Sequence, residues 1–213
     1  MPAWTSKRTS ERGPERRLGT PWLTIALHTG ALIPLVVLAW RYWQGGLGPA
    51  SVGAVIRRLG RYALGFLILS LAPTAIRTIT GYGGLLRVRR ALGLYAFFYA
   101  ALHALAFAGL DYEFRLGLLF QAIGESRREI VGLLALIILV ALAVTSIPSL
   151  MRRLGRYWQW LHRLVYAAGA LVVLHYIWNY KALRTWPALA GAALALLLAA
   201  RLMAWLRPRP RRD

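Results

Sequence analysis

The chain has 213 residues, 58% of them hydrophobic, and its 27 Lys and Arg against 7 Asp and Glu give a formal net charge of +20. A disordered basic tail is excluded because such chains are poor in aromatic and β-branched residues. A soluble domain is disfavoured because only 16% of the residues are charged. The absence of cysteine excludes disulfides, thiolate-held iron–sulfur clusters, all-thiolate zinc sites and thioether-attached haem. An integral membrane protein with basic ends accounts for both the apolar content and the charge.

Charged residues divide the chain into six long, largely uncharged runs, of which the first covers residues 18–40. A helix needs about 20 apolar residues to cross a hydrocarbon core ~30 Å thick. The runs are rich in Leu and Ala and lack the alternating pattern of a membrane β-barrel. We therefore predict an all-α integral membrane protein, a six-helix transmembrane bundle with helices near residues 20–41, 59–77, 91–110, 130–149, 157–179 and 185–206.

The distribution of basic residues predicts that both chain ends lie in the cytoplasm. With an N-in, C-in topology, the inner segments carry 16 Lys and Arg, the outer segments carry 9, and two lie within spans. The basic tails at 1–17 and 207–213 are then cytoplasmic, and we expect the first to be disordered. The connection at 111–129 has four acids against three arginines, which suits the outer face. An outer cluster of Arg57, Arg58 and Arg61 argues against this orientation.

The chain has four histidines, and all of them lie inside the predicted spans. Ionisable groups at membrane depth are costly and are therefore functional candidates. His28 stands alone on the first helix, where a hydrogen bond to a neighbouring carbonyl group that joins two helices is the simpler interpretation. His162 and His175 lie on the fifth helix, about 19.5 Å apart along its axis, and cannot both bind one metal ion.

His103 on the third helix and His175 on the fifth lie at matching depths, about 9–12 Å from the outer ends of their helices. His162 lies near the inner end instead. Two facing imidazoles in a bundle can ligate a haem iron axially, whereas zinc needs further ligands, and the acids all lie in loops or tails. We therefore predict that His103 and His175 bind haem iron in the outer half of the bundle. Nearby aromatic side chains either line the pocket or pack against lipid.

Two histidine-bearing stretches resemble the MsrQ (YedZ) family. The stretch RRALGLYAFFY at 89–99, followed by His103, is similar to the third helix of that family. The stretch LGRYWQWLHRLVY at 154–166, followed by HYIW at 175–178, is similar to the fifth, and LAVTS resembles the end of the fourth. The resemblance covers residues 20–206. The chain departs from the Arg-Pro-Tyr-like stretch with which the family enters its fourth helix.

The resemblance implies a b-type haem subunit of the ferric-reductase-like transmembrane superfamily, with residues 18–206 as its membrane domain in the bacterial inner membrane. It implies electron transfer to a periplasmic molybdopterin methionine sulfoxide reductase, MsrP, which repairs oxidised proteins. The chain would be the electron-transfer subunit of this oxidoreductase system and would not reduce methionine sulfoxide itself. Electrons would come from the quinone pool or a cytosolic flavin reductase, with FMN as a second cofactor. His103 and His175 would be the haem ligands, and His162 an alternative ligand or part of an inner-side site.

No glycine-rich phosphate motif within a βαβ unit is recognisable, so electrons must come from a quinol or from a flavin delivered by another protein. Arg89, Arg90 and Arg163 near the inner face are candidates for contacts with haem propionates or an FMN phosphate. The alternative is that they anchor the helices to phosphates of the membrane lipid. A nucleic-acid partner is rejected because the positive charges are divided by the spans rather than collected on one face.

Two other functions stay open at this point. A ferric or cytochrome b561-like reductase usually carries two paired haems, which would require His28 to act as a ligand as well. A non-redox transport or assembly module would use the histidines only as contacts between helices. A single bis-imidazole site leaves no open position on the iron, which favours electron transfer over oxygen binding.

Overall fold

A computed structural model describes residues 21–48, 50–179 and 185–206, so the predicted basic tails at 1–17 and 207–213 lie outside the described residues. Within the described ranges the regular structure is entirely helical. Its elements are α1 (Pro21–Trp43), α2 (Ser51–Thr80), α3 (Leu86–Ala106), the π-helical turn η1 (Phe107–Asp111), α4 (Leu116–Glu125), α5 (Arg127–Val144), α6 (Pro148–Leu154), α7 (Arg156–Leu161), α8 (Leu164–Trp178) and α9 (Thr185–Leu206).

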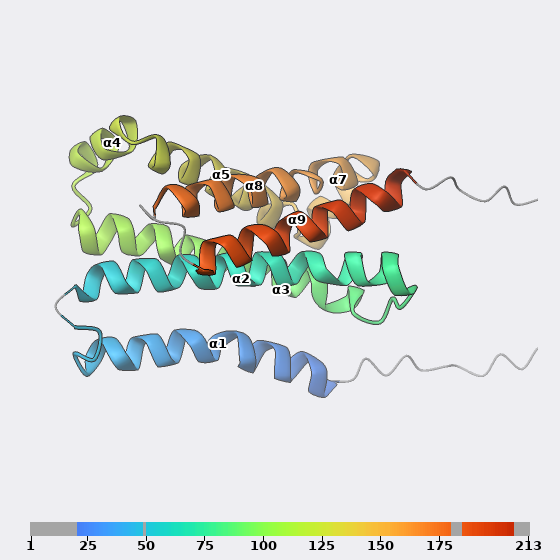
Figure 1. Ribbon diagram of the computed structural model, residues 1–213, viewed down its shortest axis with the longest axis horizontal. Helices are drawn as coiled ribbons and strands as arrows, with labels where there is room; N and C mark the ends of the chain where they lie inside the picture. Colours follow the sequence, from blue (N-terminus) through green and yellow to red (C-terminus); the bar gives the residue numbers. More distant parts are fainter. Residues whose placement is uncertain (1–20, 49, 180–184, 207–213) are drawn as a thin grey trace, which may run out of the picture.

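The long helices run side by side along the longest axis of the molecule (Figure 1). α2 and α3 occupy the middle, α1 lies along one edge, and α5 and α8 lie on the other side. The start of α1 and the end of α9 lie at the same end of the bundle. The start of α2, the short helix α4 and the end of α8 lie at the opposite end. The described ends of the chain therefore lie on the same side of the bundle, as the predicted topology requires.

Four segments of the described chain are long and apolar enough to span a membrane, at Trp22–Trp43, Ser51–Thr80, Leu86–Asp111 and Arg156–Trp178. A fifth is formed by α5 and α6 together if this pair, bent by 93°, counts as one span. The predicted sixth helix matches α9, whose described apolar part covers Leu189–Ala199. The all-helical class is thus confirmed, whereas the count of six spans stays a prediction.

Two helix boundaries differ from the prediction, because the ends of the uncharged runs do not coincide with the ends of the helices. α2 begins at Ser51, eight residues before the predicted start, so the cluster of Arg57, Arg58 and Arg61 lies within a helix. The fourth predicted helix ends early, at Val144, because Pro148 restricts the residue before it. That residue, Ile147, is extended, with φ −63° and ψ 132°, and the chain bends there.

Two further differences concern the outer connection and the fifth span. The helix α4 was not predicted, because its ten residues are too few to cross a membrane. The fifth predicted helix is irregular for one turn at His162 and Arg163, which separate α7 from α8. α4 lines one of the two cavities of the bundle, and His162 and Arg163 line the other.

Two polar contacts attach α1 to α3, one buried and one exposed. The side chain of Tyr99 is fully buried, and its hydroxyl donates a hydrogen bond of 2.6 Å to the carbonyl oxygen of Ala31. Nδ1 of His28 lies 2.7 Å from the hydroxyl oxygen of Tyr95. The ring of Tyr99 also stacks on that of Phe66 from α2, with centroids 5.3 Å apart. His28 therefore makes a helix-to-helix hydrogen bond, as the simpler interpretation expected, but its partner is a tyrosine hydroxyl and not a carbonyl group.

Candidate functional site

The imidazoles of His103 and His175 face each other between α3 and α8. Their ring centroids are 6.2 Å apart, and the ring planes are inclined at 78°. Two imidazoles that bind one metal ion through bonds of about 2 Å have centroids about 6 Å apart. The two rings lie close together, as the sequence predicted, and their spacing fits a single metal ion between them, while their binding of haem iron stays a prediction.

Each of these rings has one nitrogen committed to a backbone carbonyl. Nδ1 of His103 lies 2.9 Å from the carbonyl oxygen of Ile56, and Nδ1 of His175 lies 2.9 Å from that of Arg128. A carbonyl oxygen only accepts, so both Nδ1 atoms must carry the proton. The lone pair then lies on Nε2 of each ring. In metal-binding histidines, a hydrogen bond from the other ring nitrogen to a carbonyl oxygen fixes the ring in this way.

A glycine makes each of these hydrogen bonds sterically accessible. Gly60 lies four residues after Ile56, and Gly132 lies four residues after Arg128. In an α-helix the carbonyl of residue i points towards the N–H of residue i+4, so a side chain at i+4 crowds that carbonyl. A Cβ added at Gly60 would lie 3.2 Å from Nδ1 of His103, and one added at Gly132 would lie 2.8 Å from Nδ1 of His175. α2 and α5 thus hold the two histidines by the same device.

The facing histidines line a cavity of about 550 Å³ at the α4 end of the bundle, which we call the outer cavity. This volume falls within the range of about 300–1,000 Å³ found for cofactor sites. Its walls come from α2, α3, η1, α4, α5 and α8 and are mostly apolar, and Leu119 and Ile123 of α4 contribute to them. Its charged lining residues are Arg57, Arg61 and Glu129. The described residues hold no group of three or more His, Asp or Glu that could bind a metal ion.

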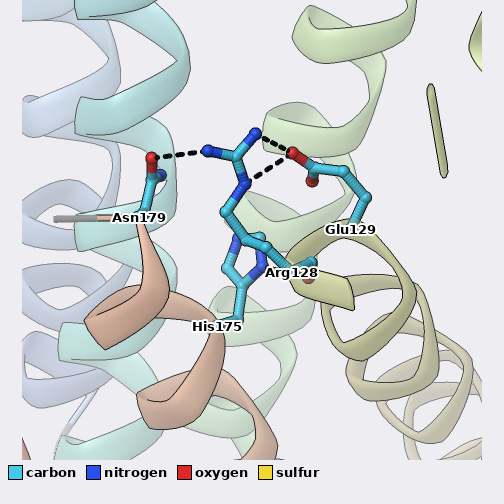
Figure 2. A network of polar contacts seen from close by, with 4 residues as sticks. All are labelled: Arg128, Glu129, His175 and Asn179. Atoms are coloured by element: carbon cyan, nitrogen blue, oxygen red, sulfur yellow. Dashed lines mark hydrogen bonds and ion pairs between the residues drawn. The ribbon is translucent and has the colours of Figure 1, made fainter. Parts of the chain in front are cut away.

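A polar network braces His175 at the rim of the outer cavity (Figure 2). The guanidinium of Arg128 donates to Oε1 of Glu129 through Nε at 2.7 Å and also through Nη2. Its Nη1 donates to Oδ1 of Asn179 at 3.3 Å, while its carbonyl accepts from His175. The side chain of Glu129 is only 13% exposed. Arg128 therefore links the start of α5 to the end of α8 and neutralises a nearly buried carboxylate.

A second cavity of about 780 Å³, the inner cavity, lies at the opposite end of the bundle and contains His162 in its lining. The rings of His162 and Trp158 are stacked, with centroids 4.0 Å apart and planes at 30°. Nδ1 of His162 lies 3.1 Å from the carbonyl oxygen of Trp158, and Nε2 lies 3.3 Å from Oγ of Ser146. The indole N–H of Trp158 donates to the carbonyl of Thr145 at 3.0 Å. His162 is thus fixed against a flat aromatic wall and lies far from the facing pair.

The three arginines predicted as cofactor contacts, Arg89, Arg90 and Arg163, all line the inner cavity and not the outer one. The Arg90 guanidinium donates to the carbonyl of Ser146 at 2.6 Å. Thr74 also lines this cavity, and its buried hydroxyl has no hydrogen-bond partner within the described residues. The inner cavity therefore combines an aromatic wall, several cations and one unsatisfied hydroxyl group.

The two cavities are separated by a buried apolar layer. Leu67 and Leu139 line both cavities, and they pack with Ala96 and Ala168. All four side chains are at most 5% exposed. The outer and inner cavities therefore lie one towards each end of the bundle, with an apolar layer between them.

Comparison with known proteins identifies the family. Residues 59–173 match the family model of the ferric reductase like transmembrane component. A protein of Rhodospirillum rubrum is 44% identical over 186 residues, covering 87% of this chain and 89% of that protein. A protein of Xanthomonas campestris pv. campestris is 42% identical over 193 residues, covering 88% of each chain. Both are named protein-methionine-sulfoxide reductase heme-binding subunit MsrQ. This chain belongs to the MsrQ family.

Membership of the MsrQ family, together with its four or five apolar spans, makes the chain a multi-pass inner-membrane protein. It also places the chain in a redox system as a ferric-reductase-like membrane subunit. The ferric-reductase match includes His103 and His162 and ends two residues before His175. The MsrQ resemblance in the two histidine-bearing stretches was therefore a correct identification.

The sequence pointed to both histidines of the outer cavity but missed the residues that hold them. Nothing in the spacing of His103 shows which carbonyl of a neighbouring helix it meets, so Gly60 and Gly132 gave no signal. From the sequence, Arg57 and Arg61 were distinctive only because they lie on the outer side, where the predicted topology expects fewer basic residues. Their i, i+4 spacing was the available clue that they share one face of a helix.

Proposed function

We propose that this MsrQ-family chain is a membrane b-type cytochrome. In this proposal it relays electrons from an inner-side donor across the inner membrane to a periplasmic molybdopterin methionine sulfoxide reductase, which repairs oxidised proteins. The names of the relatives, which specify heme binding and protein-methionine-sulfoxide reductase, support the cofactor and the partner system. The observation that carries the proposal is the facing pair of His103 and His175, whose centroid spacing of 6.2 Å fits one metal ion.

Haem b bound in the outer cavity would supply a one-electron couple there. His103 and His175 would hold its iron through Nε2. With two protein ligands on the iron, the site would suit electron transfer rather than oxygen binding. The hydrogen bonds of both Nδ1 atoms to backbone carbonyls hold the rings in place and make them stronger ligands. The aromatic and small side chains of α3, with the apolar part of α5 between Gly132 and Val140, would exclude water from the site.

The inner cavity is the proposed site of the electron donor, a quinol or a reduced flavin such as FMN. The stacked Trp158 and His162 provide a wall against which a flat ring can pack. Arg89, Arg90 and Arg163 lie where they can bind a phosphate or another anionic group. The role of His162 is then that of an inner-side residue at the donor site rather than a ligand in the outer cavity.

Absorbance spectra of the purified full-length protein test the haem assignment. We expect one haem per chain with the split reduced bands of a b-type cytochrome. His103→Ala and His175→Ala should each abolish the bands, whereas His28→Ala, which removes only a contact to Tyr95, should retain them. A colourless wild-type protein would sink the proposal. Two haems per chain would instead favour a two-haem reductase that uses the inner cavity as well.

The relay itself is tested in proteoliposomes that enclose a quinol analogue or reduced FMN as the donor. An externally added periplasmic methionine sulfoxide reductase should then turn over only when the chain is present. His175→Ala should lower turnover to the level of empty vesicles. Equal turnover with and without the chain contradicts the relay even if haem is bound.

A further inference from the structure

We infer that Arg57 and Arg61 of α2 form a binding site for two carboxylates at the rim of the outer cavity, which would hold the propionate groups of the haem. This inference rests on the proposed function and adds the residues that orient the cofactor. It also gives a role to the cluster that contradicted the charge distribution of the topology.

The position of the two arginines follows from the geometry that fixes His103. Ile56 binds the Nδ1 proton of His103, and Gly60 lies against the same ring. Arg57 follows Ile56 in the chain, and Arg61 follows Gly60. The two arginines are therefore one turn apart on a single face of α2, about 100° round the helix from the face that contacts His103. Both line the same cavity as the histidine rings. The two cations therefore belong to the α2 wall of the cavity that holds the imidazoles.

The charges of the cavity are unbalanced in favour of an anion. Arg57 and Arg61 are its cationic lining residues and Glu129 its acidic one. The Glu129 carboxylate is already paired with Arg128. Within the part of the chain that the structure describes, neither Arg57 nor Arg61 has an ion-pair or hydrogen-bond partner, and no acid occurs in the first turn of α2. Two unpaired guanidinium groups beside an apolar chamber match a flat ligand with two carboxylates.

The arginines predicted from the sequence do not fit this role. Arg89, Arg90 and Arg163 line the inner cavity, beyond the layer that contains Leu67 and Leu139. Arg128 is committed to Glu129 and Asn179, although it lies at the same rim. Arg58, between the two inferred residues, does not line the outer cavity and provides a matched control in the same helix turn.

The test compares haem b with its dimethyl ester, in which both carboxylates are blocked. The full-length protein is produced without haem and titrated with each compound, for the wild type, Arg57→Gln, Arg61→Gln, the double variant and Arg58→Gln. Affinities are read from the absorbance of the bis-imidazole complex. Because the ratio of the two affinities is measured within one variant, a general loss of folding cancels.

We expect the wild type to prefer haem b over the ester, and each single variant to lose roughly threefold to tenfold of that preference. The double variant should bind both compounds equally, Arg58→Gln should behave as the wild type, and Arg61→Lys should retain part of the preference. An unchanged ratio in the double variant overturns the inference and would leave these arginines as anchors for lipid phosphates. If the wild type binds neither compound, the proposed function fails first. If the wild type binds both equally, only the carboxylate site fails.

Discussion

Gly132 lies directly against the imidazole of His175, because a Cβ at this position would be 2.8 Å from Nδ1 and 2.9 Å from Cε1 of the ring. The equivalent distances between Gly60 and His103 are 3.2 Å and 3.3 Å. In both cases the histidine ring occupies the space that a side chain at the glycine would fill. From there the ring reaches the carbonyl oxygen of the residue one helical turn before the glycine. The two glycines therefore act as positioning residues for the histidines, and their effect should be measurable.

Gly132→Ala should displace the His175 ring and lower the haem affinity about tenfold or more, since overpacking costs ~1–3 kcal/mol. Gly60→Ala should have a smaller effect, because its closest contact is longer. The measurements are haem titration and the low-spin electron paramagnetic resonance spectrum, whose g-values report the orientation of the ligand rings. Gly65→Ala on the same helix is the control, because nothing lies within 4 Å of a Cβ there. Helix propensity alone would make all three variants more stable, so equal or improved haem binding in Gly132→Ala contradicts the prediction.

The ion pair beside His175 should tune the reduction potential of the bound haem. Arg128→Gln would leave the nearly buried Glu129 carboxylate unpaired, and a negative charge near the iron stabilises the oxidised form. We expect the midpoint potential to fall by on the order of tens of millivolts. A redox titration followed by absorbance measures this shift.

The double variant Arg128→Gln with Glu129→Gln is the control for that prediction. It removes both charges and keeps the backbone carbonyl that binds His175. Its potential should return close to the wild-type value. If the double variant stays as low as the single variant, the shift arises from altered packing and not from the carboxylate.

Trp158→Leu should slow the delivery of electrons to the haem without removing it. The substitution deletes the ring that stacks on His162 and the hydrogen bond to the carbonyl of Thr145. We expect the rate of haem reduction by the inner-side donor to fall about tenfold, while haem content and potential stay unchanged. Stopped-flow absorbance with a quinol analogue or reduced FMN measures the rate. Trp43→Leu provides the comparison, because Trp43 is 79% exposed and lines neither cavity.

The absence of native cysteine permits a direct test of the N-in topology, since each introduced thiol is the only one in the chain. Gln44 lies between α1 and α2, and Tyr82 lies between α2 and α3 with 62% of its side chain exposed. In intact spheroplasts, a membrane-impermeant maleimide should label Gln44→Cys and should not label Tyr82→Cys until the cells are opened. The reverse pattern would show that the chain is inserted with its N-terminus outside.

Tyr99→Phe should loosen α1 without disturbing the haem. The Tyr99 hydroxyl is fully buried and bonds to the carbonyl of Ala31. Its loss should lower the free energy of unfolding by about 1 kcal/mol, measured by thermal denaturation in detergent. Tyr95→Phe removes the contact to His28 at an exposed position and should cost less. A larger loss in Tyr95→Phe contradicts this ranking.

The sequence predicted those features that depend on one helix at a time. Uncharged runs located the spans, and counting the rise per residue placed His103 and His175 at one depth and His162 at another. The missed features depend on contacts between helices. The hydrogen-bond acceptor of His103 is a carbonyl on α2, and no periodicity in α3 encodes it. α4 was missed for a different reason. Its apolar positions, which include Leu119 and Ile123, are too few to form a membrane-spanning segment.

The layer of Leu67, Ala96, Leu139 and Ala168 has a consequence for energetics across the membrane. Its four side chains are all apolar, so none of them can carry a proton. An electron that tunnels through this layer without a proton makes the proposed transfer electrogenic. With the N-in orientation and a membrane potential negative inside, each electron that crosses the whole membrane gains about 2.3 kcal/mol per 100 mV. The resting potential of the cell would thus drive reducing power outward and help to sustain protein repair beyond the membrane.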